Sequence, residues 1–519
     1  MKLNRTLPAA LAALLILSAA ACNINTTETE TTSASAASTA EVSETGTTAE
    51  DTAEAEDTET TAEAENTDTN TGDSSQEDSA RPDAPPDGEG GPGEGGDRPE
   101  GAPPDGEGGG FGGGSSSSDI DYTAAVTIDS ADTQSGGSYV STTADESALL
   151  VSTSDSVTIE NVTVEKTGDS DGGDNCNFYG LNAAVLAKDG ANVTITGGTI
   201  TSDADGANGV FSYGGNGGQN GDEGDGTTVT IRDTVITTTG NGSGGIMTTG
   251  GGITYAYDLT VTTSGQSSAA IRTDRGGGTV VVDGGTYTSN GLGSPAIYST
   301  ADITVSNAEL VSNLSEGVCI EGKNSITLEN CELTANNTKC NGNATFYDSI
   351  MIYQSMSGDA DSGTSSFTMT DGTLTSKNGH IFHVTNTNAV ITLTNVQLVN
   401  EDSEGVLLSV CDDGWSGAEN IATLNAVNQV LEGTILVGDN STLTLNLTEG
   451  SSFTGSISGE ITNASGETVS TEAGTVSVTL DESSTWTLTA DTWITEFNGS
   501  TDNIISNGYT LYVNGTAVN

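Results

Sequence analysis

Apolar and polar residues alternate in a short stretch that recurs along the chain. It reads VTIENVTV at residues 157–164, VTITGGTI at 193–200 and ITLTNVQL from Ile391. Alternation with a period of two predicts a β-strand with one buried face. The shortest intervals between copies are roughly 23–27 residues, which indicates a stacked repeat architecture.

Each copy contains one bend residue that divides it into two short strands. The bend residue is always Asn, Asp or Gly, types that tolerate a left-handed backbone conformation. The bend positions are Asn161, Gly197, Asp233, Asp258, Gly284, Asn307, Asn330, Asp371 and Asn395. A third apolar segment follows most copies, as in AAVLAK at 183–188 and GHIFHV at 379–384. Three short strands per repeat predict an all-β fold, a parallel β-helix solenoid in which each repeat pairs with the next.

The first 118 residues differ from the repeats. Residues 1–21 combine Lys2 and Arg5 with an apolar run and small residues, which predicts a signal peptide. Residues 22–118 are rich in Thr, Glu, Pro and Gly, and their few large apolar residues predict a disordered acidic tether. The repeats then occupy residues 119–413, and residues 414–519 carry a changed pattern that predicts C-terminal β-helix strands and a cap.

The signal peptide ends in Ala-Ala-Ala-Cys, with Cys22 as the first cysteine. This sequence resembles a bacterial lipobox, although Ala19 stands where the family prefers Leu. The resemblance implies that Cys22 is lipidated and that the chain is anchored to the outer face of a bacterial membrane, exposed at the cell surface. An ordinary secretory signal followed by an unrelated cysteine is the alternative.

The repeats resemble the right-handed parallel β-helix of the pectate lyase-like superfamily. That superfamily includes polysaccharide lyases, glycoside hydrolases, esterases and non-enzymatic adhesins, so the resemblance implies a fold and no single reaction. Asp412-Asp413 matches one motif of polygalacturonase-like enzymes, but Gly-His-Gly and Arg-Ile-Lys are missing. The phrases at 443–455 and 476–488 resemble the C-terminal end of autotransporter passenger domains.

The net charge of −61 limits the partners. Nucleic acid is excluded because its binding requires clustered Lys and Arg. Contact with a membrane is expected only through the lipid, and polyanionic glycans are disfavoured unless Ca²⁺ bridges them.

Five cysteines follow Cys22. Because their number is odd and their spacing matches no zinc site, we predict that most are buried thiols, and a Cys331–Cys340 disulfide is the alternative. These cysteines are Cys176, Cys319, Cys331, Cys340 and Cys411.

The second position of each third strand forms a column that we predict to point outward. The column reads Leu186, Phe211, Met247, Arg272, Tyr298, Cys319, Phe382 and Leu407. Exposed aromatic rings at this spacing could stack on sugar rings, so Phe211, Arg272, Tyr298 and Phe382 are the predicted ligand-binding residues. In the alternative, the long inserts of the chain fold over the column and bury it.

One pair of carboxylates suggests catalysis. Asp274 and Glu321 occupy the same third-strand position two repeats apart, about 9.6 Å from each other. This lies at the upper edge of the separation of about 6.5–9.5 Å in inverting glycosidases, and Arg272 is close in sequence to Asp274. In the alternative, these are ordinary charged residues that form salt bridges.

The two histidines, His380 and His383, lack an evident third metal ligand and are interpreted as structural.

An acidic loop and rows of threonine are two further candidate sites. Asp169, Asp171 and Asp174 form an acidic loop that is a candidate for Ca²⁺, although its spacing departs from the EF-hand pattern and a solvated loop is the alternative. Threonine rows resemble flat ice-binding faces, but Thr also simply suits strands. These rows contain Thr199, Thr260 and Thr286, and Thr201, Thr237, Thr262 and Thr288, and Glu165, Glu309 and Glu332 interrupt them.

Together these patterns predict a monomeric surface lipoprotein whose β-helix binds a glycan, or another ligand on a host or neighbouring cell, without catalysis or a cofactor. A polysaccharide lyase or glycoside hydrolase acting beside the third strands is the alternative. A structural surface rod is the second alternative.

Overall fold

The computed structural model describes residues 120–170, 172–215 and 223–519. The predicted signal peptide, Cys22, the predicted tether and Asp171 lie outside these residues. The described chain forms a parallel β-helix, as the repeats predict. Each rung, meaning one full turn of the solenoid, contributes one strand to a 15-stranded sheet, here called sheet A, and one or two strands to a 20-stranded sheet, sheet B.

Sheet A is built from the third strand of each rung. Its strands are β1 (Thr123–Ile128), β4 (Glu146–Ser152), β7 (Val185–Lys188), β10 (Val210–Tyr213), β13 (Ile246–Thr249), β15 (Ile271–Thr273), β17 (Ile297–Ser299), β20 (Val318–Glu321), β22 (Asp348–Tyr353), β24 (His380–Thr385), β27 (Val406–Val410), β29 (Val430–Val437), β31 (Ser452–Ser458), β35 (Thr485–Leu488) and β38 (Ile504–Ile505).

Sheet B is built from the two strands on either side of the bend. Its strands are β2 (Asp132–Ser135), β3 (Ser138–Ser141), β5 (Ser156–Glu160), β6 (Thr163–Lys166), β8 (Asn192–Thr196), β9 (Thr199–Ser202), β11 (Thr228–Arg232), β12 (Val235–Thr238), β14 (Gly252–Thr263), β16 (Gly278–Ser289), β18 (Asp302–Ser306), β19 (Glu309–Ser312), β21 (Ser325–Ala335), β23 (Thr364–Ser376), β25 (Asn388–Thr394), β26 (Gln397–Asn400), β28 (Asn420–Val427), β30 (Ser441–Thr448), β34 (Thr475–Leu480) and β37 (Glu496–Asn498).

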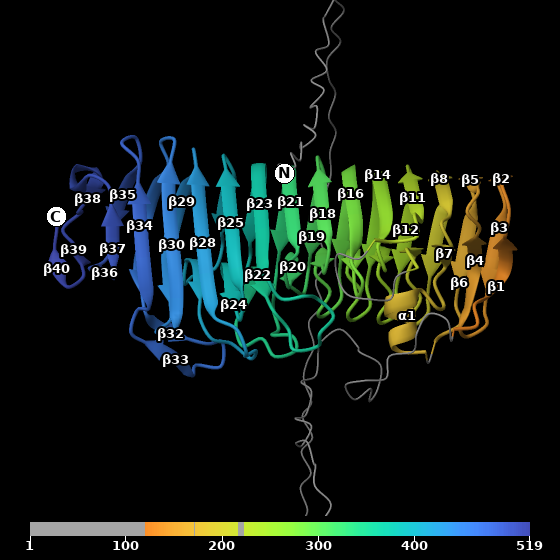
Figure 1. The fold of residues 1–519 in the computed structure, drawn as a ribbon, viewed down its shortest axis with the longest axis horizontal. Coiled ribbons are helices and arrows are strands. Elements are labelled where there is room, and N and C mark those ends of the chain that lie inside the picture. Colours follow the sequence, from red (N-terminus) through yellow and green to blue (C-terminus); the bar gives the residue numbers. More distant parts are fainter. Residues whose placement is uncertain (1–119, 171, 216–222) are drawn as a thin grey trace, which may run out of the picture. The chain divides into compact units, whose positions relative to one another are not determined.

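Successive rungs pair in parallel and in sequence order (Figure 1). For example, β5, β6 and β7 form one rung, and they pair with β8, β9 and β10 of the next. In β14, β16, β21 and β23 the two sheet B strands run together as one long bent strand, because the backbone continues its pairing through the bend.

The predicted bends are confirmed at all nine positions. Every bend residue has a positive φ, from 49° at Asp233 to 78° at Gly284. Some bend side chains also bond from rung to rung, since Asn330 Nδ2 donates to Asn307 Oδ1 at 2.9 Å and Asn307 Nδ2 donates to Asp283 Oδ1 at 2.7 Å. The bends therefore turn the chain and also link the rungs at the surface.

The main core fills the inside of the solenoid. One continuous cluster of buried apolar side chains extends from Ile128 to Leu511. The alternating residues of each strand supply it: Val157, Val193 and Val229 lie directly next to one another in register on β5, β8 and β11. Each rung therefore buries its apolar side chains against its neighbours, and no rung has a core of its own.

The solenoid continues beyond residue 413, because β28 pairs with β25 and β30 pairs with β28. An antiparallel hairpin, β32 (Glu460–Thr462) with β33 (Thr468–Thr471), projects from this part. A three-stranded sheet of β36 (Thr492–Ile494), β39 (Leu511–Val513) and β40 (Thr516–Ala517) and the 3₁₀ turn η2 (Thr501–Asn503) end the chain. Within the described residues, the structure contains no helix long and apolar enough to span a membrane.

Candidate functional site

The side chains of sheet A that point away from the main core form one row, here called the outer row. Register places Leu186, Phe211, Met247, Arg272, Tyr298 and Cys319 side by side, as the sequence predicts. The row continues through Met351, His383 and Ser409.

Phe382 and Leu407 do not belong to the outer row, so this part of the predicted column is wrong. Phe382 pairs with Ile350 and Leu408, and both Phe382 and Leu407 lie in the main core with 0% exposure. The alternation does not define the phase here, because Ile381 and Phe382 are adjacent apolar residues. The predicted column also lacks a member from β22, which lies between β20 and β24.

The predicted exposed stripe is also wrong, and the alternative of a covered column is confirmed. Phe211 is 0% exposed and Tyr298 is 8% exposed. Helix α1 (Asp174–Tyr179) places Phe178 and Tyr179 against Leu186, Phe211 and Met247. Ala344 and Trp415 pack in the same way near Tyr298, Cys319 and Met351. The rings of Phe211, Tyr298 and Phe382 therefore present no open face to a ligand.

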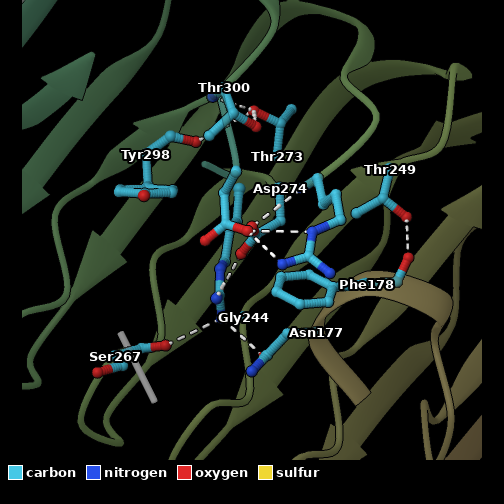
Figure 2. A network of polar contacts seen from close by, with 12 residues as sticks. Asn177, Phe178, Gly244, Thr249, Ser267, Thr273, Asp274, Tyr298 and Thr300 are labelled. Carbon is cyan, nitrogen blue, oxygen red and sulfur yellow. Dashed lines mark hydrogen bonds and ion pairs between the residues drawn. The ribbon is translucent and has the colours of Figure 1, made fainter. Parts of the chain in front are cut away.

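A buried ion pair occupies the centre of the covered row. Arg272 Nη2 lies 2.8 Å from Asp274 Oδ2, and the two side chains are 2% and 6% exposed. Arg272 Nη1 also donates to Asn177 Oδ1 and to the Ser267 carbonyl, each at 3.2 Å. Figure 2 shows Asn177 and Phe178 of α1 on the same side of the sheet as Asp274. Burial raises the pKa of Asp274 to about 7, against the opposite effect of Arg272.

A second ion pair joins the neighbouring loop to this cluster. Arg275 Nη2 lies 2.6 Å from Asp359 Oδ1, and Arg275 Nε donates to the same oxygen at 3.0 Å. The Arg275 guanidinium also lies 3.9 Å from the centre of the Phe178 ring, a cation–π contact. Residues more than 80 positions apart, on three separate segments, thus meet over the middle of sheet A.

Glu321 is the third buried carboxylate of the cluster. Its Oε2 accepts hydrogen bonds from the hydroxyls of Tyr298 at 2.5 Å and Tyr353 at 3.1 Å, and Ser355 Oγ donates to Oε1. Burial raises the pKa of Glu321, and these hydrogen bonds act in the opposite direction. Arg272, Tyr298 and Cys319 are aligned on β15, β17 and β20, and Asp274 and Glu321 each lie two residues further along, so the two carboxylates occupy equivalent positions two rungs apart, as predicted.

This cluster has the groups of an acid–base site, but its carboxylates are buried. Asp274 is 4% exposed and Glu321 is 2% exposed. A small surface depression beside Arg272 and Tyr298 is lined by Ser267, Ala269, Arg272, Gly293, Pro295 and Tyr298. The ion pairs and hydrogen bonds of the cluster attach α1 and the 354–361 loop to sheet A. This agrees with the alternative that Asp274 and Glu321 are charged residues with structural partners.

The two histidines belong to a separate buried cluster. His380 Nδ1 and His383 Nδ1 each lie 2.7 Å from Ser409 Oγ, and His383 Nε2 lies 3.2 Å from Asp413 Oδ2. The ring of Phe346 covers both imidazoles. Burial lowers the pKa of His380 to about 3, so this imidazole is neutral. Sequence reasoning missed Ser409 and Asp413 as partners, and the available signal was the pair Asp412-Asp413, which follows β27 after one residue.

The acidic loop predicted for Ca²⁺ is described only in part. Asp169 Oδ1 accepts a hydrogen bond from the Asp205 amide at 2.9 Å, and Asp174 begins α1. Across residues 120–170, 172–215 and 223–519, no three His, Cys, Asp or Glu side chains converge as a metal site.

The five cysteines of these segments are free thiols, and Cys340 alone among them is partly exposed.

Sheet B differs from sheet A because its outward rows remain open. Two of these rows are rich in threonine: the first contains Thr194, Thr230, Thr304, Thr327, Thr368 and Thr392, and the second contains Thr201, Thr237, Thr262, Thr288, Thr334 and Thr375. These two rows are here called the threonine face. Each of these side chains is partly or fully exposed.

The threonine face is regular but not continuous. Tyr255 and Val281 interrupt the first row, and Val311 interrupts the second. Neighbouring rungs place equivalent hydroxyls about 4.8 Å apart. Arg232, at the edge of the face, lies 3.6 Å from the centre of the Tyr257 ring.

Comparison of the chain with protein-family models, with curated proteins and with solved structures gave no match in any of the three.

Proposed function

We propose that the protein is an exported bacterial lipoprotein of the pectate lyase-like β-helix type, anchored through Cys22, that binds a glycan or another surface ligand without catalysis. The signal-peptide pattern and the lipobox-like sequence support the anchor. The long acidic segment before residue 119 supports display at a distance from the membrane.

The observation that carries the binding proposal is the contrast between the two sheets. The outer row of sheet A is buried beneath inserts, whereas the threonine face of sheet B is open. We therefore move the proposed binding surface from Phe211, Tyr298 and Phe382 to the threonine face. A threonine offers a hydroxyl to the hydroxyls of a sugar and a methyl group to its apolar face.

The charge of the chain narrows the ligand class. A net charge of −61 repels polyanions, so a neutral polysaccharide is the preferred partner. The enzyme alternative retains one supporting observation: burial raises the pKa of Asp274 to about 7 and also raises that of Glu321, and strongly shifted carboxylates are typical of catalytic sites. Their burial argues against it, because a polymer would need the inserts to move.

Retention on a panel of neutral and acidic polysaccharides tests this proposal, with release of reducing or unsaturated ends measured in the same wells. The wild type is compared with Thr237→Glu/Thr262→Glu/Thr288→Glu on the threonine face. The matched control, Thr462→Glu/Thr468→Glu/Thr471→Glu, adds the same charge on the exposed β32–β33 hairpin. We expect retention on a neutral polymer, its loss in the first variant, and its persistence in the control.

Two other outcomes would contradict the binding proposal. Cleavage that disappears in Asp274→Asn or Glu321→Gln would establish the enzyme. Neither retention nor cleavage on any polymer would favour the structural rod.

A further inference from the structure

Two buried carboxylates lie next to each other where the chain enters sheet A. Glu316 precedes β20, and Asp348 begins β22. Val318 pairs with Ile350, and the Gly317 amide donates to the Ser349 carbonyl at 2.8 Å, so Glu316 and Asp348 occupy equivalent positions on adjacent rungs. Equivalent residues on adjacent parallel strands are about 4.8 Å apart. Glu316 is 2% exposed and Asp348 is 0% exposed.

Asp348 has no hydrogen-bond donor in the described chain. Both of its carboxylate oxygens are buried without a partner, and so is Asn337 Oδ1. Asn337 is itself tied to Glu316, because its Nδ2 donates to Glu316 Oε1 at 3.3 Å, and Ser315 Oγ donates to Oε2. Three orphaned oxygens thus belong to residues at or next to one carboxylate pair.

No charge in the surroundings balances this pair. Among the described residues, no ion pair involves Glu316 or Asp348. His380 lies beside Asp348 in register, but its Nδ1 is bound to Ser409 Oγ and the imidazole is neutral. The other charged group that faces Asp348 is Asp413, which adds repulsion. Two adjacent buried carboxylates require either a shared proton or a bound cation.

We propose that Glu316, Asp348 and Asn337 bind a calcium ion. The orphaned atoms are all oxygens, which are the ligands of Ca²⁺, and buried unsatisfied oxygens commonly mark a missing ion or water. The softer ligands nearby are already engaged, since Cys340 Sγ contacts the Phe346 carbonyl and His380 contacts Ser409. Calcium accepts carboxylate, amide and carbonyl oxygens together, so it does not need three acidic or histidine side chains.

The position of the ion gives it a structural role. Asn337 follows β21 and Asp348 begins β22, so the ion joins both ends of the 336–347 insert to Glu316. This insert carries Ala344, which packs over the outer row beside Tyr298 and Cys319, and Phe346, which covers the histidines. Calcium thus stabilises part of the cover of sheet A. The inference does not rest on the proposed glycan binding.

Calorimetric titration of the EDTA-treated full-length chain with CaCl₂, together with thermal unfolding with and without CaCl₂, tests the site. We expect one Ca²⁺ per chain and a rise of several degrees in Tm, and both effects should be lost in Asp348→Asn. Glu332→Gln, an exposed carboxylate of sheet B, is the matched control and should behave as the wild type. Asp169→Asn/Asp174→Asn, in the loop first considered for Ca²⁺, should also retain both effects.

A gain-of-affinity variant keeps the test independent of any loss of folding. Asn337→Asp adds a carboxylate to the proposed ligands and should lower the Kd for Ca²⁺ several-fold while reducing Tm in EDTA. The proposal is overturned if the wild type binds no Ca²⁺, if only the loop variant loses binding, or if Asn337→Asp leaves the Kd unchanged. A higher Tm of Asp348→Asn that is independent of Ca²⁺ would instead establish a proton-sharing pair.

Discussion

Sheets A and B are built from the same repeat, yet between β7 and β27 the outward side chains of sheet A are buried while those of sheet B stay at the surface. Met247 in sheet A and Thr237 in sheet B belong to the same rung and both point away from the main core, but Met247 is 0% exposed and Thr237 is partly exposed. The difference comes from the inserts, which enter beside sheet A strands and fold over them. In this solenoid, the repeat determines the stack and the inserts determine which side remains a surface.

The largest expected loss of stability follows the removal of an aromatic ring that the inserts bury against sheet A. Phe211→Ala should lower the free energy of unfolding by about 3–5 kcal/mol, because it leaves a cavity among Phe178, Leu186 and Met247. Thr237→Ala on the threonine face should change it by less than about 0.5 kcal/mol. Denaturant unfolding followed by circular dichroism measures both, and equal small effects would mean that the outer row is exposed.

The same comparison of buried and exposed positions can be made with two ion pairs. Arg272→Met should cost about 3–5 kcal/mol, because Asp274 loses its buried partner, and Arg272→Met/Asp274→Leu should recover much of this loss. Lys323→Met, which breaks the more exposed pair with Asp361, should cost less than about 1 kcal/mol. Similar losses in Arg272→Met and Lys323→Met would contradict the burial of the Arg272 pair.

The raised pKa of Asp274 predicts a pH dependence of stability. A folded-state pKa of about 7, above the ordinary value of 3.8, means that the folded chain binds more protons between these pH values. Stability should therefore fall as pH rises through this window, and Asp274→Asn should have a shallower fall than the wild type. Glu321, whose pKa is also raised, acts in the same direction, whereas His380 acts in the opposite direction.

Denaturant midpoints at several pH values between 4 and 7 measure this difference. Curves of the same slope for the wild type and Asp274→Asn would show that Asp274 does not titrate in this range. His380 belongs to the separate histidine cluster, so its effect cancels in the comparison, whereas Glu321 interacts with Asp274 and its contribution is part of the measured difference.

A bend should give a smaller effect than the buried ring or the buried ion pair. Asn330 has a φ of 52°, a left-handed conformation that alanine adopts less readily. Asn330→Ala should therefore lower the free energy of unfolding by about 1 kcal/mol, and it also removes the hydrogen bond to Asn307. Asn330→Gly tolerates this φ and should cost less than Asn330→Ala. The reverse order of the two variants in a thermal unfolding series would contradict the role given to the bend.

The sequence predicted the parts of the fold that depend on local pattern. Alternation predicted the strands of the repeats, and the Asn, Asp and Gly positions predicted nine bends, because these residue types tolerate the left-handed backbone at the turn. The shared position of Asp274 and Glu321 also followed from the repeat alone. The prediction failed at Phe382, where two adjacent apolar residues leave the phase of a strand undefined.

The cover of sheet A was not predictable in the same way. Its contacts join Asn177 to Arg272 and Asp359 to Arg275, across inserts that have no period. An insert can fold outward or inward with the same composition, and contacts such as the packing of Phe178 and Ala344 decide between them. The unpaired oxygens of Asp348 likewise follow from tertiary contacts and have no signal in the spacing of residues.

Thiol labelling of the full-length native protein tests most directly whether sheet A is covered and sheet B open. Cys319 lies in the outer row and is 6% exposed, and Thr288→Cys places a second thiol on the threonine face. With labelled peptides identified by mass spectrometry, the account predicts fast labelling at position 288 and none at Cys319 until the chain is unfolded. Labelling of Cys319 as fast as position 288 in the native protein would contradict it.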